Sequence, residues 1–513
     1  MSSHLPSRED GVLISYVITW ESRALLLGKN IFQVPMYASY KNVLAYSDPF
    51  LSTGILNIPF IFFTSNSVLT SNLHLVFGTF IFFIAMMLLC IALFDSFPGA
   101  LLSALTATFS EYHFHYLVHL HTYLLAGVPL CLLFALLWKR TSSLNALVLA
   151  AVSFLYQALN APMTAFFLFF ILLPFLSDKS LRVFLLAKKK IVFLLSISVL
   201  SLCTVFYLPY FQVSREFHYT RTIRDTAHFA HSLNIFFHVQ TLFLGVICVL
   251  FLLTSRQTPK QRLPRIFLAI VGIGALFMLG PVLKINDQTF KFFSLPIPLP
   301  YALAYYIIPG FKAFRDVSRW IVVFGFGISL LSGYLLSRSS IDQRIKYMIC
   351  VVFALLYFQT QVPFLQTFPI PHTLPHIYAT VPKNSKNILA EFPAYSWRMM
   401  PYASKENDRL LYQLTHHQVL FNGVTGFTPP DREKDLDWLW KTFPSPEAFA
   451  YLKKQGVTHI IVHFDEYQTL TQNHYVYAGA AAPAPLQLAR SLATYMSLQR
   501  LDCQERACAY KIL

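Results

Sequence analysis

The sequence predicts a polytopic α-helical membrane protein that carries a small α/β domain at its C-terminal end. Of the 513 residues, 55% are hydrophobic and only 12% are charged, whereas a soluble domain has roughly 25% charged residues. About ten apolar stretches are long enough to be membrane helices, and basic residues concentrate in alternate loops between them. From about Pro369 the pattern changes to short strands and amphipathic helices.

Residues 1–72 are expected to form an external cap with interfacial helices. The stretch 14–30 is apolar but broken by Glu21, Arg23 and Lys29, as in a short amphipathic helix that lies in a membrane interface. The next apolar run, 51–63, contains Gly, Asn and Pro and is too short to span comfortably. The polar first residues exclude a signal peptide.

Residues 73–365 are expected to form the transmembrane domain. The predicted spans are 73–94, 98–114, 120–138, 144–159, 161–177, 191–210, 234–254, 266–283, 318–337 and 345–363. Basic clusters such as Lys188–Lys190 mark one set of loops as cytoplasmic by the positive-inside rule. The cap, the two long loops and the C-terminal portion then lie outside. An external N-terminus without a preceding span requires either that the cap crosses the membrane without a signal or that a first helix is missing from this chain, and the second is expected.

Residues 366–513 are expected to form an external α/β domain. Strands are predicted at 386–394, 417–424 and 457–464, helices at 445–456 and 486–497, and a terminal hairpin at 498–513. Cys503 and Cys508 would face each other across the turn of this hairpin. In an oxidising compartment the expectation is a disulfide, and the alternative is two free thiols.

The segment 109–121, FSEYHFHYLVHLH, places Glu111 and four histidines between two apolar spans. On a continuous helix, Glu111 would share a face with His115, and His115 with His119. Ionisable groups at the rim of a membrane are functional candidates, here as ligands or proton-transfer groups. The alternative is that histidine and tyrosine only anchor the helix ends in the interface.

Further charged residues fall on the predicted external side: the acids Asp10 and Asp48, and the loop arginines Arg221, Arg224, Arg315 and Arg319. Carboxylates opposite arginines suit a lipid-linked phosphate substrate. A carboxylate could act as a base or bind a divalent cation, and arginine binds phosphate bidentately. Each group also has an ordinary alternative. The acids could be solvated, Arg315 and Arg319 could contact lipid headgroups, and the loop arginines could pair with Glu216 and Asp225.

The order of these features resembles a family. EDGVLISYVITWESRALL is followed by P-x-Y…AYSDP, then E-x-H-x-H…H-x-H, then PGFKAFRDVSRW, and last EFPA and NGVTGFTPP. Over nearly the whole chain this arrangement is similar to bacterial polytopic glycosyltransferases of the GT-C fold, which use polyprenyl-phosphate sugars as donors. The resemblance implies that Asp10 is the catalytic Asp and that Asp48 and Glu111 are further acidic site residues.

The same resemblance implies that His113 and His115 lie beside these acids and that Arg315 and Arg319 are candidates for the lipid phosphate. Asp48, Glu111 and His115 are tentative ligands for Mg²⁺ or Mn²⁺.

The expected function is therefore transfer of a sugar from a polyprenyl-phosphate donor to an external glycan, lipid or protein acceptor, with an Asp as general base. The expected location is a bacterial plasma membrane, with the soluble domain outside and membrane lipids as partners. No zinc spacing or RNA-binding signature supports a nucleic-acid partner. One alternative is a transporter or flippase of lipid-linked glycans, although its usual two-half symmetry is not visible. The other is a catalytically degenerate, glycan-binding accessory protein.

Overall fold

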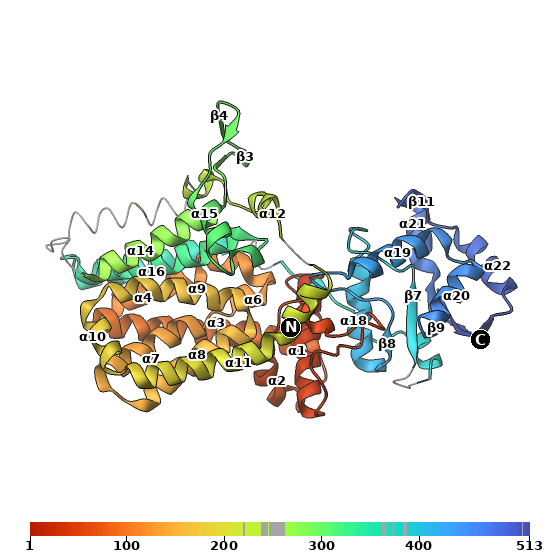
Figure 1. The fold of residues 1–513 in the computed structure, drawn as a ribbon, viewed down its shortest axis with the longest axis horizontal. Helices are drawn as coiled ribbons and strands as arrows, with labels where there is room; N and C mark the ends of the chain where they lie inside the picture. The colour runs from red at the N-terminus through yellow and green to blue at the C-terminus, as the bar shows by residue number, and fades with distance from the viewer. Residues whose placement is uncertain are drawn as a thin grey trace. The chain divides into compact units, whose positions relative to one another are not determined.

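The structure, a computed structural model, describes residues 1–218, 221–237, 245, 262–361, 366–371, 373–382, 387–504 and 506–513. Two compact units account for these residues. The first unit comprises 1–72, 209–217 and 367–513, and the second comprises 73–208 and 218–366. Figure 1 shows both as ribbons, and each is described by itself below.

The second unit is built mainly of helices. Its longer helices, of which α3 begins and α11 ends among residues of the first unit, are α3 (Ser67–Phe94), α4 (Phe97–Phe109), α7 (Gly127–Thr141), α8 (Leu144–Asn160), α9 (Pro162–Leu172), α10 (Lys179–Ala187), α11 (Lys189–Glu216), α14 (Arg262–Met278), α15 (Pro300–Ile307), α16 (Ile321–Arg338) and α17 (Gln343–Gln361). Shorter turns connect them: α5 (Glu111–Phe114), η2 (His115–Val118), α6 (Leu120–Tyr123), η3 (Leu173–Ser177), α12 (Ile223–His228), η4 (Leu233–Phe237), η5 (Phe311–Ala313) and η6 (Val317–Trp320).

Helix α16 is the centre of this unit, packed against α4 and α14. A Cβ added at Gly333 of α16 would lie 2.2 Å from the carbonyl oxygen of Gly99 in α4, so the two backbones approach closely because both positions are glycine. Ser103 strengthens this crossing by donating from Oγ to the carbonyl of Ser329 at 2.8 Å. Small residues and interhelical hydrogen bonds are the usual means by which membrane helices associate.

Four described helices are long and apolar enough to cross a membrane, or five if the bent pair α9–η3 and α10 counts as one: Ser67–Phe94, Leu120–Thr141, Lys189–Glu216 and Val317–Arg338 are the four. The expected ten spans are therefore not confirmed. The prediction at 234–254 falls largely outside the described residues. The predicted span 98–114 is wrong as a continuous helix, because α4 ends at Phe109 and α5 starts after Ser110.

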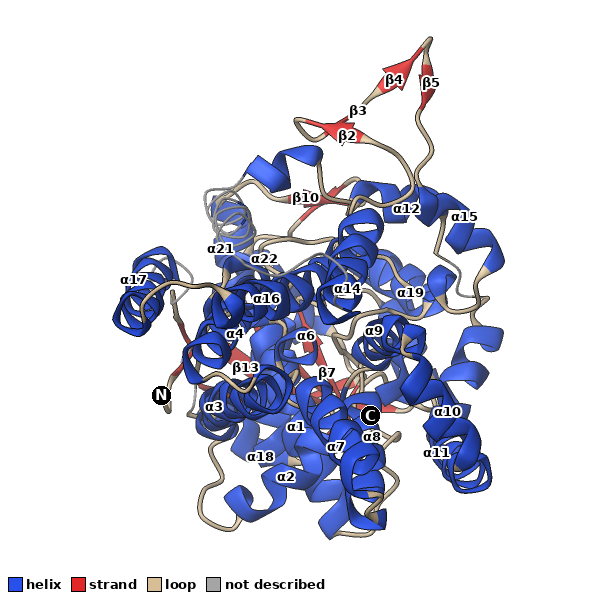
Figure 2. Cartoon of the chain, turned by 90° about the vertical axis from the view of Figure 1, so that its left-hand side faces the viewer, coloured by secondary structure: helices blue, strands red, loops and turns tan. Residues whose placement is uncertain are grey.

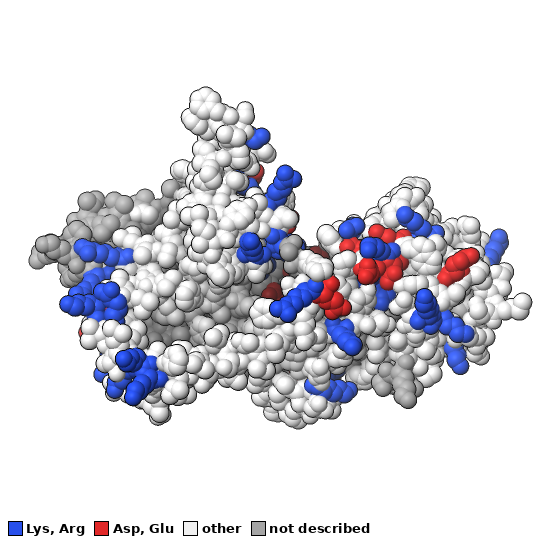
Figure 3. Space-filling view, in the orientation of Figure 1, with Lys and Arg blue, Asp and Glu red and all other residues white. Residues whose placement is uncertain are grey.

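Burial separates central helices from peripheral ones. In Val317–Arg338, 94% of the most apolar window is buried inside the protein, whereas none of that window is buried in Lys189–Glu216. An apolar helix with no protein cover needs an apolar solvent, which is the environment that lipid supplies. Figure 3 shows Lys and Arg gathered around α10 at one end of the helical unit, where Lys139 and Arg262 both pair with Asp178. Two short hairpins, β2 (Lys284–Ile285) with β3 (Gln288–Thr289) and β4 (Lys291–Phe292) with β5 (Leu295–Pro296), project from the same unit (Figure 2).

The first unit contains a five-stranded mixed sheet in the order β12-β13-β9-β7-β8. Its strands are β7 (Ile388–Phe392), β8 (Val419–Leu420), β9 (Val457–His463), β12 (Leu498–Gln504) and β13 (Ala507–Ile512). β8, β7 and β9 run parallel, and β13 and β12 continue antiparallel. The strands predicted from sequence in this domain are confirmed, as are the helix α20 (Pro446–Lys454) and the helix α22 (Pro485–Thr494).

Three helices of this unit were not predicted: α18 (Ser404–His416), α19 (Pro430–Thr442) and α21 (Phe464–Gln472). Short pairs complete it: β1 (His4–Leu5) with β6 (Phe368–Pro369), and β10 (Val476–Tyr477) with β11 (Ala480–Ala481), besides the turns η1 (Val43–Tyr46) and η8 (His376–Thr380). The sheet core is apolar, with Ile460, Val462 and Leu452 completely buried.

The N-terminal segment packs on this sheet domain. It contributes α1 (Asp10–Leu26) and α2 (Leu51–Ile61), which confirms a helix over the predicted interfacial stretch. Tyr16 of α1 donates to Gln413 of α18 at 3.0 Å, and Arg23 donates to the carbonyl of Leu414 at 2.6 Å. Residues 35–38 run along the edge strand β8, because Leu420 N–H donates to Pro35 and Ala38 N–H donates to Leu420. The predicted cap and the C-terminal domain thus share one unit.

Candidate functional site

The segment 109–121 does not form one helix. Three short turns, α5, η2 and α6, follow one another, with non-helical backbone at Tyr116 and His119. The expected helical face shared by Glu111, His115 and His119 is therefore wrong. The turns redirect the side chains, so that some point into the core and others toward a cavity.

His113 belongs to the core. Its Nδ1 lies 2.8 Å from the carbonyl oxygen of Thr108, and its Nε2 lies 2.8 Å from that of Tyr123. The ring stacks on Tyr123 with centroids 4.2 Å apart and is 3% exposed. Each ring nitrogen thus faces a carbonyl oxygen, one just before the junction and one just after it, and the nitrogen that carries the proton donates to its carbonyl. His113 does not line the cavity described next, and its expected place in a substrate site stays a prediction.

Glu111 and His115, by contrast, line one cavity of about 220 Å³ together with Tyr116. The other walls come from distant parts of the same unit: His231, Ser232, Asn234 and Ile235 around η4, Asp287 in the β2–β3 turn, and Ile321 at the start of α16. Lys284 stabilises the segment before η4, because it donates from Nζ to the carbonyls of His228 and Ala230 at 2.9 and 3.2 Å. Two acids and two histidines therefore converge on one pocket.

The residues around His115 shift the pKa of its imidazole. Burial lowers the pKa of His115, the charge of Glu111 opposes that shift, His119 adds to it and Asp316 opposes it. Burial disfavours the charged imidazolium, whereas a neighbouring carboxylate favours it. A neutral imidazole beside a carboxylate can accept a proton from a bound hydroxyl or pass one on.

Arg319 is linked to the surroundings of His115 by an ion pair with Asp316. It donates from Nε to Asp316 Oδ2 at 3.0 Å and from Nη1 to His121 Nε2 at 2.6 Å. Asp316 in turn receives the backbone N–H of Ser318, whose hydroxyl lies 3.5 Å from the hydroxyl of Tyr116. The guanidinium is therefore held in a fixed orientation by two partners, which take two of its five N–H donors.

Two of the other arginines sit near each other. Burial lowers the pKa of Arg221, nearby Arg315 lowers it further, and Asp225 opposes both. Arg315 lies 4.9 Å from the ring centroid of Phe229 and is otherwise exposed. Arg224 is exposed on α12. Two guanidinium groups with one nearby acid leave an excess of positive charge, which favours an anion.

The first unit holds the remaining predicted acids. Asp10 is the first residue of α1 and is exposed, at the end of a helix where the backbone dipole stabilises a negative charge. Asp48 is half-buried between η1 and α2. Sequence reasoning missed a third acid: Glu21 of α1 is completely buried and accepts the N–H of Phe50 at 3.3 Å. Burial raises the pKa of Glu21 to about 8, and the Phe50 hydrogen bond moderates this.

His231 and Asp287 line the same cavity as Glu111. Asp287 was also missed, and no motif marks it: it lies 176 positions after Glu111 and reaches the cavity only because the β2–β3 turn folds back. Within the described ranges no group of three or more His, Cys, Asp or Glu side chains is arranged to hold a metal ion. The tentative Mg²⁺ or Mn²⁺ site of Asp48, Glu111 and His115 stays a prediction.

The predicted disulfide is present, with Cys503 bonded to Cys508 between directly opposed positions of β12 and β13. It lies in the sheet domain of the first unit and takes no part in the cavity around Glu111.

The fold has known counterparts. The crystal structure of ArnT from Cupriavidus metallidurans bound to undecaprenyl phosphate matches with a TM-score of 0.52 at 10% identity, covering 99% of this chain and 94% of that one. The apo state of ArnT matches with a TM-score of 0.51 at 11% identity over the same shares. The archaeal oligosaccharyltransferase AglB from Archaeoglobus fulgidus, in complex with an inhibitory peptide and a dolichol-phosphate, reaches only 0.45 at 13% identity, over 92% and 67%.

No protein-family model matches the sequence, and no curated protein sequence matches it either. The likeness to ArnT is therefore one of fold, and it extends over nearly the whole of both chains. It confirms the expected GT-C fold.

Proposed function

We propose that this chain is a membrane glycosyltransferase that moves a sugar from a polyprenyl-phosphate donor to an acceptor hydroxyl. The observation that carries the proposal is the cavity in which Glu111 and His115 meet, at the edge of a helical unit with the GT-C fold. The donor class is supported by the structural neighbour, since ArnT was crystallised with undecaprenyl phosphate. Glycan, lipid and protein remain the candidate acceptors.

The chemistry is a single displacement. The acceptor oxygen attacks the anomeric carbon, the bond from that carbon to the phosphate oxygen breaks, and the configuration inverts. The acceptor proton passes to a carboxylate, for which Asp10 is the proposed base by resemblance, with Asp48 and Glu111 as supporting acids. The neutral imidazole of His115 offers a second proton acceptor in the cavity.

The leaving group is polyprenyl phosphate, which gains negative charge as the bond breaks. Arg319 is suited to stabilise it, because Asp316 and His121 already fix its guanidinium and no reorientation is needed during the reaction. Arg221, Arg224 and Arg315 supply further positive charge. The lipid tail of the donor would lie against apolar helix surface such as that of α11, which no protein atoms bury in its most apolar window.

The proposed setting is a bacterial plasma membrane. The basic cluster around α10 would be cytoplasmic, and the sheet domain and the segment 109–121 would face outward. The disulfide Cys503–Cys508 supports an oxidising compartment for the sheet domain.

The test is sugar transfer in membranes supplied with a polyprenyl-phosphate sugar. Asp10→Asn, Asp48→Asn and Glu111→Gln keep the size of each side chain and remove its charge. We expect each to reduce transfer by at least about a hundredfold, the usual contribution of a positioned acid or base. Asp431→Asn is the matched control, since Asp431 is 77% exposed and its ion pair with Lys434 lies on the surface. Unchanged transfer in all three variants would overturn the proposal.

A further inference from the structure

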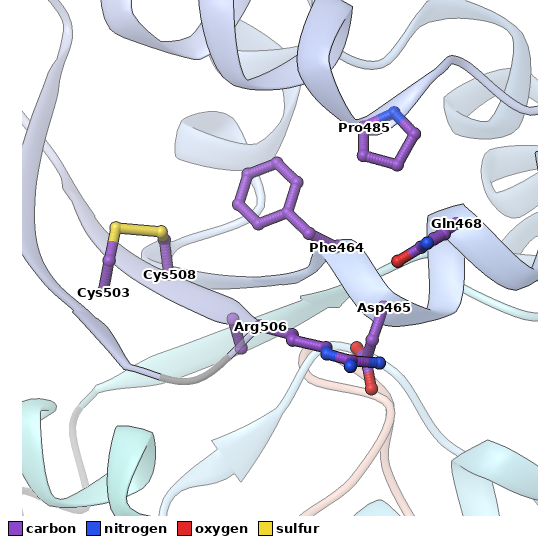
Figure 4. A pocket seen from close by; sticks show the side chains of 8 residues that line it. Phe464, Asp465, Gln468, Pro485, Cys503, Arg506 and Cys508 are labelled. Carbon is purple, nitrogen blue, oxygen red and sulfur yellow. A yellow bond between two sulfur atoms is a disulfide. The ribbon is translucent and has the colours of Figure 1, made fainter.

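We propose that the sheet domain contains a sugar-binding site, separate from the cavity at Glu111, formed by α21, the β12–β13 hairpin and the segment 395–405. Two neighbouring cavities of about 330 and 340 Å³ share the side chains of Asp465, Gln468 and Arg506. Figure 4 shows the first of them, with these three residues among its walls. Sites for small molecules typically have about 300–1,000 Å³, so each cavity is large enough for a ligand.

The chemistry of the walls suits a polyhydroxylated ligand. The shared residues are a carboxylate, an amide and a guanidinium, which together accept and donate hydrogen bonds in several directions. Phe464 adds an aromatic ring to the first cavity, and Tyr395 and Tyr402 line the second. A sugar ring has hydroxyls around its rim and an apolar C–H face, so it can use both kinds of wall. A purely apolar ligand would leave the charged groups desolvated and unpaired, which is costly.

Asp465 and Arg506 are the central pair. Among the described residues neither side chain makes an ion pair or a hydrogen bond, although both face the same two cavities and carry opposite charge. The neighbouring acid behaves differently: Glu466 receives the guanidinium of Arg409 at 2.8 Å. Adjacent hydroxyls of a sugar could therefore donate to Asp465 and accept from Arg506 without first breaking an internal ion pair.

The backbone segments that carry Asp465 and Arg506 are held in place by several contacts. Arg409 binds both Glu466 and Glu406, which fixes the first turn of α21 from below. The backbone N–H of Phe464 donates to the carbonyl of Arg506 at 2.8 Å, and the disulfide Cys503–Cys508 closes the turn that carries Arg506. At the far end of α21, Asn473 donates to the hydroxyl of Tyr402 at 2.7 Å. A site held in place in this way loses little freedom when a ligand binds.

We assign the site to a sugar unit of the acceptor. The assignment of this sugar to the acceptor rests on the proposed function. The binding of a sugar at this site does not depend on it. The ligand expected is a neutral hexose or N-acetylhexosamine, because the two central charges cancel and hydroxyls satisfy both.

The experiment is saturation-transfer difference NMR on the purified full chain in detergent, with glucose, galactose, mannose and N-acetylglucosamine as probes. We expect saturation of at least one sugar. Asp465→Asn and Arg506→Gln should each weaken its binding by about tenfold or more, since each removes a charge-assisted hydrogen bond. Arg490→Gln on α22 is the matched control, because Arg490 is exposed and lines neither cavity.

Saturation of none of the four sugars, or saturation that both variants leave unchanged, would overturn the inference. Asp10→Asn separates it from the proposed function. If that variant still transfers sugar while the Asp465 and Arg506 variants lose binding, the transferase mechanism fails and the sugar site stands. If transfer depends on Asp10 and no probe binds, the sugar site fails and the transferase mechanism stands.

Discussion

Arg409 donates from Nη1 to Glu406 Oε1 at 2.6 Å, and both side chains are only 2% exposed. The same guanidinium contacts Glu466 at 2.8 Å and approaches Glu391 at 3.5 Å. One buried cation thus serves three carboxylates at the centre of the sheet domain. Burial raises the pKa of Glu406 to about 7, and Arg409 opposes this shift.

Replacing Arg409 by Met should strongly destabilise the sheet domain, because the variant leaves buried carboxylates without their counter-charge. Breaking a buried ion pair on one side costs about 3–5 kcal/mol. Thermal unfolding of the full chain measures the effect. Arg398→Met is the control: Arg398 is 52% exposed and pairs with Glu433, so its loss should cost less than about 1 kcal/mol. Equal stability of the two variants would contradict this role of Arg409.

Glu21 should make the stability of the first unit depend on pH. Its pKa rises from 4.5 to about 8 on folding, because burial disfavours the carboxylate. The contribution of Glu21 to the free energy of unfolding is therefore fully present below about pH 4.5, where the carboxyl is protonated in both states. It is lost as the pH rises through about 8. Glu21→Gln should flatten this part of the stability profile and leave the part due to Glu406. Glu447→Gln, at an exposed position, should keep the slope of the unmodified protein. A profile that Glu21→Gln does not alter would show that the carboxyl ionises without cost.

Arg319→Lys should impair transfer although the charge is kept. Lysine cannot reproduce the planar fork that binds Asp316 and His121 at once. We expect transfer to fall about tenfold or more, measured as initial rate against donor concentration. Arg338→Lys is the control, since Arg338 is an exposed residue in the last turn of α16. Equal rates for both variants would remove Arg319 from the phosphate site.

The disulfide should contribute modestly to the sheet domain. Cys503 and Cys508 are five positions apart, and closing so short a loop stabilises a fold by about 2 kcal/mol in the chain-entropy model. Replacing both by Ser should lower the midpoint of thermal unfolding, and the unmodified protein should behave alike after reduction. Labelling of both thiols in the folded, non-reduced protein would contradict the bond itself.

The sheet domain shows what a sequence can predict. VTHIIVHF forms β9 and LQRLDCQERACAYKIL forms the hairpin β12–β13, as predicted, because a short apolar run bounded by polar residues is a local property of the sequence. α21 was missed because it begins directly after β9 without a turn residue between them. The apolar face of α21 is recognisable only when the sheet that it packs against is known.

The cavity around Glu111 shows where local reasoning ends. The cluster of Glu111 and His115 was visible in the sequence, but its expected helical geometry was wrong because the chain turns after Ser110 and again at His119. Ser232 and Asp287 join that cavity through tertiary folding, and their spacing from Glu111 carries no periodicity. His113, adjacent in sequence, was drawn into the core by two carbonyl groups that no motif announces.

The edge of the five-stranded sheet has a practical consequence. β8 is the outermost strand, and its open side is occupied by residues 35–38. Arg432, which is completely buried, ties them further by donating to the carbonyl of Ala38 at 2.8 Å. A fragment cut to start at residue 367 would leave that backbone edge bare, and bare edges pair with other chains. Anyone expressing the soluble portion alone should expect aggregation, and should supply the first 72 residues as a separate polypeptide to restore a soluble particle.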